Sequence, residues 1–124
     1  MNILNIFLIA IGGALGSVAR YLLSSFVLRA TGTLFPLGTF VVNAVGCLVF
    51  GIIAGAATER VQLAPGLRLF LLTGILGGFT TFSSYAFESF GLLQDGQFAA
   101  ALINILGQVV AGLLGMWIGF AVSR

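Results

Sequence analysis

Polar side chains recur at helical spacing inside three long apolar segments of this sequence. They are Thr39 and Asn43 in one segment, Thr73, Thr80, Ser84 and Glu88 in the next, and Asn104 and Gln108 in the last. Residues three or four positions apart share one face of a helix, so each set forms a polar stripe. Hydroxyl and amide groups in apolar surroundings either bond neighbouring helices together or line a polar path across a membrane. The residues alone leave both interpretations open.

The sequence GGFTTF at positions 77–82 adds two further kinds of chemistry. Paired glycines followed by two threonines predict a break in the helical hydrogen-bond ladder at Gly77 and Gly78, and the freed carbonyl oxygens could hold a hard cation such as Na⁺. Phe79 and Phe82 flank the threonines, and a phenyl ring turned edge-on presents partial positive charge to an anion without trapping it. The alternatives are close helix packing for the glycines and contact with lipid or neighbouring helices for the rings.

Composition indicates the environment in which these groups work. Of 124 residues, 60% are hydrophobic and 6% are charged, whereas a soluble domain carries roughly 25% charged residues. We therefore predict an all-α membrane protein. The chain has no His and a single cysteine, Cys47, which excludes a His-based triad, a Cys/His zinc cluster and a disulfide within the chain, so an enzyme is not expected. A net charge of +2 without a basic run argues against nucleic-acid binding.

One domain, residues 1–124, is expected to cross the membrane four times. Charged residues, prolines and loop residues divide the chain into spans at roughly 3–28, 37–57, 67–93 and 98–122. Each span carries two glycines four residues apart, a spacing that allows membrane helices to approach closely. The four spans are therefore expected to pack as one tight bundle.

The arginines give a weak signal for orientation. With four spans, the two termini and the second connection share one side, which holds Arg60, Arg68 and Arg124. The other side holds Arg29 and, if it reaches that surface, Arg20. A bias this small allows insertion in both directions, and two oppositely inserted copies would form a symmetric dimer. A single fixed orientation remains the alternative.

Three strings in the first three spans resemble a known family. They are GGALGSVARY at 12–21, LGTFVVN at 37–43 and TGILGGFTTFS at 73–83. In order and spacing they are similar to the CrcB-type fluoride channels, also called Fluc, and the fourth span matches more loosely. The resemblance implies an antiparallel, dual-topology homodimer in the cell inner membrane, with a broken third helix and two pores along the subunit contacts. It also implies that these pores export cytosolic fluoride passively.

The resemblance further implies roles for individual residues along the pores. Phe79 and Phe82 match the pair whose ring edges line the path, and Asn43 matches the asparagine whose amide donates toward the ion or orients a ring. Hydroxyls near the path and the basic residue of the vestibule follow from the same match: Thr39, Thr81 and Arg20.

Two further sets of residues follow from the match. The backbone carbonyls of Gly74 and Gly77 from both subunits match a central site for structural Na⁺. Additional candidates for pore lining are Asn104, Gln108, Ser84 and Glu88. The fourth span departs from relatives that carry Tyr and Ser along its polar face.

Two other functions compete with this one. A small four-span multidrug transporter would have similar size, but such proteins depend on an acidic residue in the first span, and residues 1–28 contain none. A non-transporting scaffold subunit would use the polar stripes only to hold helices together. Ion flux through the purified protein separates the scaffold from the channel.

Overall fold

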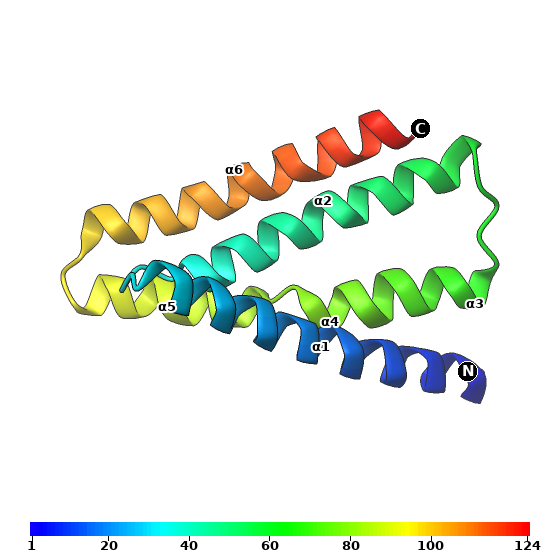
Figure 1. Ribbon diagram of the computed structural model, residues 1–124, viewed down its shortest axis with the longest axis horizontal. Coiled ribbons are helices and arrows are strands. Elements are labelled where there is room, and N and C mark those ends of the chain that lie inside the picture. Colours follow the sequence, from blue (N-terminus) through cyan, green and yellow to red (C-terminus); the bar gives the residue numbers. More distant parts are fainter.

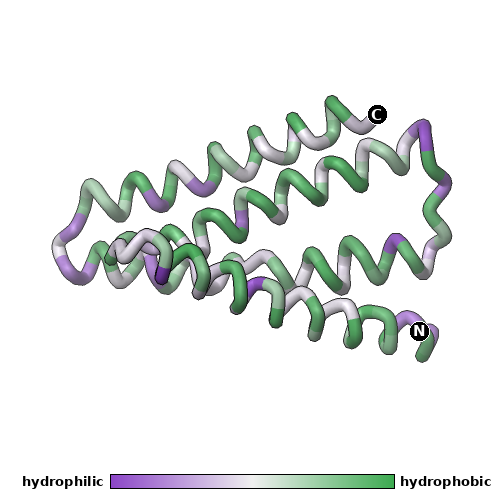
Figure 2. Tube along the Cα trace, in the orientation of Figure 1, coloured by the Kyte–Doolittle hydropathy of each residue, from purple (hydrophilic) through white to green (hydrophobic).

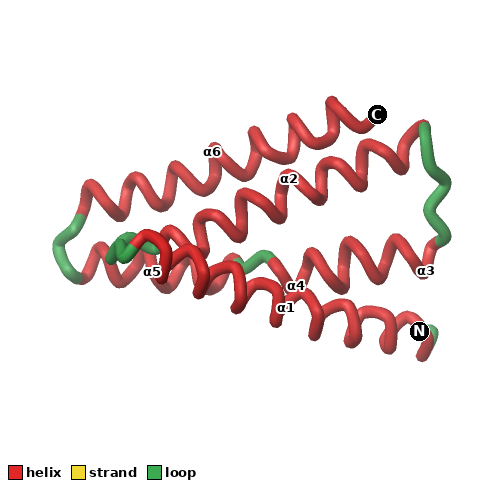
Figure 3. The backbone as a smooth tube through the Cα atoms, viewed as in Figure 1, coloured by secondary structure: helices red, strands yellow, loops and turns green.

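A computed structural model describes all residues, 1–124, as a bundle of helices (Figures 1 and 3). The elements along the chain are α1 (Ile3–Thr31), α2 (Leu37–Glu59), α3 (Pro65–Arg68), the π-helix η1 (Leu69–Leu76), α4 (Gly77–Phe79), α5 (Phe82–Gln94) and α6 (Phe98–Ser123). The segments α3, η1, α4 and α5 follow one another as a single span, Pro65–Gln94. The prediction of four helical spans is confirmed, and the predicted ends lie within a few residues of the observed ones.

Local sequence signals account for where the helices begin and end. The Asn2 side chain accepts a hydrogen bond from the Leu4 N–H at 3.0 Å, which caps the start of α1. Gly32 ends α1 with φ of 60°, a left-handed conformation that glycine adopts without a steric penalty. Pro36 and Pro65 stand at the starts of α2 and α3, where a missing N–H leaves no carbonyl unpaired.

The bundle consists of two closely packed pairs of spans. Helix α1 packs along η1 and α4, and α2 packs along α6 (Figure 1). Glycines form both contacts: a Cβ on Gly16 would collide with the carbonyl oxygen of Ile75, and one on Gly119 would collide with that of Leu48. Backbones therefore touch directly, which is how membrane helices gain packing energy without a hydrophobic driving force. The prediction of a tight, glycine-packed bundle is confirmed.

The third span is broken, but three residues later than the glycine pair predicted. Gly77 and Gly78 are helical, and the extended residues are Thr80, with φ −84° and ψ 157°, and Thr81, with φ −149° and ψ 115°. Figure 3 shows this break as the loop between α4 and α5. Gly78 serves packing instead, since a Cβ there would lie 2.5 Å from the carbonyl oxygen of Gly13, whereas Gly77 has no such close contact.

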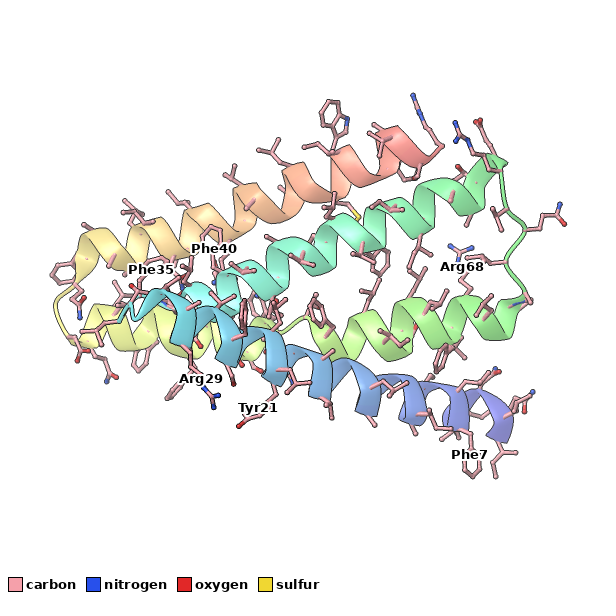
Figure 4. All side chains as sticks on the ribbon, in the orientation of Figure 1. Phe7, Tyr21, Arg29, Phe35, Phe40 and Arg68 are labelled. Atoms are coloured by element: carbon pink, nitrogen blue, oxygen red, sulfur yellow. The ribbon has the colours of Figure 1, made fainter.

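The outer surface of the bundle is apolar along its length. Figure 2 shows hydrophobic residues over most of every helix, and Figure 4 shows Phe7, which is 61% exposed, pointing away from α1. All four spans are long and apolar enough to cross a bilayer. The two termini lie at the same end, and Arg29 and Arg68 lie at opposite ends of the bundle (Figure 4). The protein is a multi-pass membrane protein.

Candidate functional site

The break in the third span is held open by one side chain of α2. The Oδ1 atom of Asn43 accepts a hydrogen bond from the Thr81 N–H at 2.8 Å, and the Nδ2 atom of Asn43 donates to the Thr81 carbonyl at 3.1 Å. Asn43 thus pairs with both backbone groups of Thr81, as a neighbouring peptide would. Unpaired backbone groups at membrane depth cost several kcal/mol each. The two hydrogen bonds from Asn43 offset this cost and stabilise the extended conformation of Thr81.

Thr80 stabilises the end of the helix before the break with two hydrogen bonds. Its N–H and its hydroxyl Oγ1 both donate to the Leu76 carbonyl, each at 3.0 Å. The Thr81 hydroxyl caps the new helix, since Oγ1 accepts from the Ser84 N–H at 3.1 Å. The two threonines therefore end one helix and begin the next within two residues.

A cavity of about 360 Å³ lies beside the break, between α2, α5 and α6. Its lining contains hydroxyl, amide and aromatic groups and no charged residue. The lining residues with a hydroxyl, amide or aromatic side chain are Asn43, Phe50, Thr80, Thr81, Phe82, Tyr85 and Gln108. We call this space the uncharged cavity.

Three aromatic residues line the uncharged cavity, Phe50, Phe82 and Tyr85, and the rings of the last two stand together. The Phe82 and Tyr85 ring centroids are 5.6 Å apart with planes tilted by 43°, and both residues line the cavity. The predicted partner, Phe79, does not line it; its ring lies against Gly46 of α2. Sequence reasoning missed Tyr85, although it stands three residues after Phe82 and therefore on the same face of α5.

Hydrogen bonds hold the walls of the uncharged cavity. The Tyr85 hydroxyl donates to the Ile105 carbonyl of α6 at 2.9 Å, which fixes the ring. The Nδ2 atom of Asn43 also donates to Oε1 of Gln108 at 2.8 Å, so α2 and α6 are joined across the cavity. Phe82 is 80% exposed in the single chain. This ring is therefore available to lipid or to another protein surface.

A second cavity, of about 280 Å³, lies between α1, α2 and α5. Its lining is almost entirely polar and includes five of the predicted site residues: Arg20, Thr39, Thr81, Ser84 and Glu88. The remaining residues are three serines and a tyrosine of α1: Ser17, Ser24, Ser25 and Tyr21. We call this space the charged cavity. Thr81 lines both cavities and so stands between them.

The acidic group of the charged cavity is only partly paired. Oε1 of Glu88 accepts a hydrogen bond from the Thr39 hydroxyl at 2.8 Å, while the buried Oε2 has no protein partner. The Thr81 hydroxyl donates to Ser84 Oγ at 3.0 Å on the same wall. A basic residue, an acidic residue and several hydroxyls thus meet where α1 passes the broken helix.

The two polar residues of α6 occupy different places. Gln108 lines the uncharged cavity, whereas Asn104 is 0% exposed and lines neither cavity. Nε2 of Gln108 donates to Oδ1 of Asn104 at 2.9 Å, and Nδ2 of Asn104 donates to Ser89 Oγ at 2.9 Å. Asn104 is therefore joined to the cavity wall through Gln108 and, by way of Ser89, to the backbone of Tyr85.

The two glycines expected to hold Na⁺ differ in how free their carbonyls are. The Thr81 N–H, which would pair with the Gly77 carbonyl in a continuous helix, bonds to Asn43 instead. Gly77 is also exposed, so its carbonyl oxygen, a hard ligand, fits a cation at the surface of the chain. Gly74 is buried against Gly12, and its carbonyl accepts the Gly77 N–H. Gly77 fits the expected role better than Gly74.

Comparison with known proteins places this fold and site in a family. The family model described as "CrcB-like protein, Camphor Resistance (CrcB)" matches residues 7–120. The chain belongs to the CrcB family. The three strings that carry the resemblance, at 12–21, 37–43 and 73–83, lie inside the matched region of this CrcB chain, and the family expected from them is confirmed.

Curated members of the CrcB family are similar to this chain over nearly its whole length. A protein of Nitratidesulfovibrio vulgaris named "Fluoride-specific ion channel FluC" is 49% identical over 119 residues, which cover 96% of each chain. Proteins of the same name from Maridesulfovibrio salexigens and Methylobacillus flagellatus are 49% and 47% identical, over 94% and 96% of this chain and 92% and 94% of theirs. These CrcB relatives are named as ion channels. The prediction that this member of the family is not an enzyme is confirmed.

Proposed function

We propose that this chain is a fluoride-selective ion channel. Two copies, inserted in opposite directions in the cell inner membrane, would form a homodimer whose two pores export cytosolic fluoride passively. The observation that carries the proposal is the uncharged cavity, where hydroxyls, amides and three aromatic rings lie beside a broken membrane helix without a charged residue. The printed names of the relatives support the same ion.

The chemistry of the cavity suits a small, strongly hydrated anion. A selective path must replace its water shell with several correctly placed donors. The second Nε2 hydrogen of Gln108 and the edges of the aromatic rings are such donors, and each is weak enough to release the ion again. The hydroxyls of Thr80, Thr81 and Tyr85 would join them only by leaving their present acceptors in the protein. A fixed cation at this point would bind the ion too tightly, because Coulomb energy grows as the effective dielectric falls.

The charged cavity would serve as the vestibule of this path. The guanidinium of Arg20 would raise the local concentration of anions there. Thr81, which lines both cavities, would then pass the ion toward the Phe82 ring. In this proposal charge acts where the ion enters, and neutral donors act where it is selected.

A second, oppositely oriented copy would complete the pores. The weak arginine bias allows both orientations, and Phe82 is 80% exposed in the single chain, which leaves room for a partner to cover it. Na⁺ held by the carbonyls of Gly77, with Gly74 as the weaker candidate, would sit at the centre of the dimer. Such an ion would compensate the carbonyl dipole that the break leaves unpaired.

Efflux from liposomes tests the proposal directly. Protein reconstituted into vesicles loaded with fluoride or chloride is expected to release fluoride far faster, as measured with ion-selective electrodes. Equal rates for the two anions would reject selectivity. No release of either anion would favour a scaffold subunit, and drug-driven proton movement would favour a multidrug transporter.

A further inference from the structure

We propose that Asn104 is a positioning residue for the conduction site, acting through Gln108. This role presupposes the proposed fluoride channel. Asn104 is buried and lines neither cavity. In this proposal Asn104 holds the Gln108 amide so that Gln108 keeps one N–H available at the wall of the uncharged cavity.

A single backbone group sets the direction of the whole amide chain. The Thr81 N–H can only donate, so Asn43 must turn Oδ1 toward it and Nδ2 toward Gln108. Gln108 must therefore offer Oε1 to Asn43 and Nε2 to Asn104, at 2.8 and 2.9 Å. Asn104 in turn offers Oδ1 to Gln108 and Nδ2 to Ser89. The orientation of every amide in the chain follows from the N–H that the break releases.

Ser89 fixes the far end of this series of hydrogen-bonded amides. The Ser89 hydroxyl accepts from Asn104 and donates to the Tyr85 carbonyl at 2.7 Å. A hydroxyl has one hydrogen, and this bond uses it, so Ser89 can only accept from Asn104. This series of hydrogen-bonded side chains therefore begins at the break and ends at the backbone carbonyl of Tyr85 in α5. Reversing any one amide would leave two donors or two acceptors facing each other.

Counting hydrogens identifies the amide that is free to act at the cavity. Nδ2 of Asn43 carries two hydrogens, and both have partners, the Thr81 carbonyl and Oε1 of Gln108. Nε2 of Gln108 also carries two, but only the bond to Asn104 uses one of them. Since both amides line the uncharged cavity, the amide hydrogen without a protein partner there belongs to Gln108. Asn43 holds the break, and Gln108 faces the ion.

Removal of Asn104 should therefore leave the Gln108 amide, which is the donor at the cavity, without a fixed direction. In Asn104→Leu, which keeps the branched shape of the side chain, Nε2 of Gln108 loses its acceptor and the amide can rotate about its last torsion. A donor without a fixed direction no longer favours the small ion over a larger one, because selectivity depends on donors held in place. We expect Asn104→Leu to lower fluoride efflux by about tenfold, the effect of losing one or two buried hydrogen bonds, and to lower the fluoride-to-chloride ratio.

A double-mutant cycle distinguishes positioning from a general structural role. We expect Gln108→Met to lower the fluoride-to-chloride ratio, and Asn104→Leu to have no further effect on that ratio when Gln108 is already Met. Leu106→Met, a change on the exposed face of the same helix, is the matched control and should leave the ratio unchanged. Effects of the two substitutions that simply add, or a ratio unchanged in Asn104→Leu, would overturn the positioning role.

Two further measurements keep the test decisive. If Asn104→Leu does not fold, Ser89→Ala removes the acceptor one step farther along the chain and should lower the ratio in the same direction by a smaller factor; an unchanged ratio overturns the proposal. Side-chain amide exchange of Gln108, followed by NMR in detergent, should be slow in the wild type and faster in Ser89→Ala. Wild-type protein without selective fluoride efflux rejects the proposed function itself, whereas selective wild type with unaffected variants rejects only the positioning role.

Discussion

The uncharged and charged cavities share Thr81 in their walls but differ in whether charged side chains line them. The charged cavity holds Arg20 and Glu88 among hydroxyls, and of these two groups Arg20 attracts anions from solution while Glu88 opposes it. The uncharged cavity is lined by amides, hydroxyls, three aromatic rings and apolar side chains, and hydrogen bonds join its walls between α2, α5 and α6. In the proposed channel, long-range attraction would act at the entrance and short-range replacement of water at the broken helix.

The largest expected effect comes from removing a ring edge at the uncharged cavity. Phe82→Ile should lower fluoride efflux by roughly 100-fold, since it removes a group that touches the ion in the proposed path and a loss of about 3 kcal/mol corresponds to such a factor. Liposome efflux measures the rate, and size-exclusion chromatography checks that the assembly state is kept.

Phe79→Ile is the matched control for this experiment. The Phe79 ring lies against Gly46 and does not line the cavity, so its replacement by another apolar side chain should leave efflux within about fivefold of wild type, which corresponds to about 1 kcal/mol. The opposite ranking, with Phe79 essential and Phe82 dispensable, would restore the pair expected from the sequence and remove Phe82 from the path.

An intermediate effect is expected at the charged cavity. Arg20→Gln should lower fluoride efflux by about three- to tenfold at low ionic strength, because the local anion concentration falls with the loss of the field. At high ionic strength the difference from wild type should shrink, since charges are screened over about 3 Å at 1 M salt. The Phe82→Ile defect should not depend on salt. An Arg20→Gln defect that persists at high salt would mean that Arg20 acts by direct contact.

The smallest effect is expected from a single hydroxyl. Tyr85→Phe keeps the ring and removes the bond to the Ile105 carbonyl, which is worth about 1 kcal/mol. Fluoride efflux should stay within about threefold of wild type, while thermal stability in detergent should fall slightly. A large loss of efflux would show that the Tyr85 hydroxyl itself contacts the ion, and the ring edge would lose its assigned role.

The spans and their packing could be predicted from the sequence because they depend on properties of single segments. Long apolar stretches, flanking prolines and glycine pairs act locally, so four helices and a tight bundle follow from them. Arg20, Thr39 and Ser84 can be singled out in the sequence as polar groups in apolar spans, and the structure brings them together in the charged cavity. Their role in conduction stays a prediction.

The position of the break and the ring pair depended on contacts between distant residues. Gly77 and Gly78 carry the propensity to break a helix, yet the break falls at Thr81 because Asn43, 38 residues away, captures its N–H. Tyr85, on the helix that begins after the break, lines the cavity. Partners so far apart in the chain leave no local pattern, although the three-residue spacing of Phe82 and Tyr85 was visible in the sequence.

The central claim is that neutral donors and ring edges beside the broken helix select fluoride. A planar bilayer containing the purified protein, with fluoride on one side and chloride at equal concentration on the other, tests it most directly. The account predicts a reversal potential far from zero, with the sign of fluoride moving down its own gradient. A reversal potential of zero, with measurable current, would show that the two anions permeate equally and would contradict the claim.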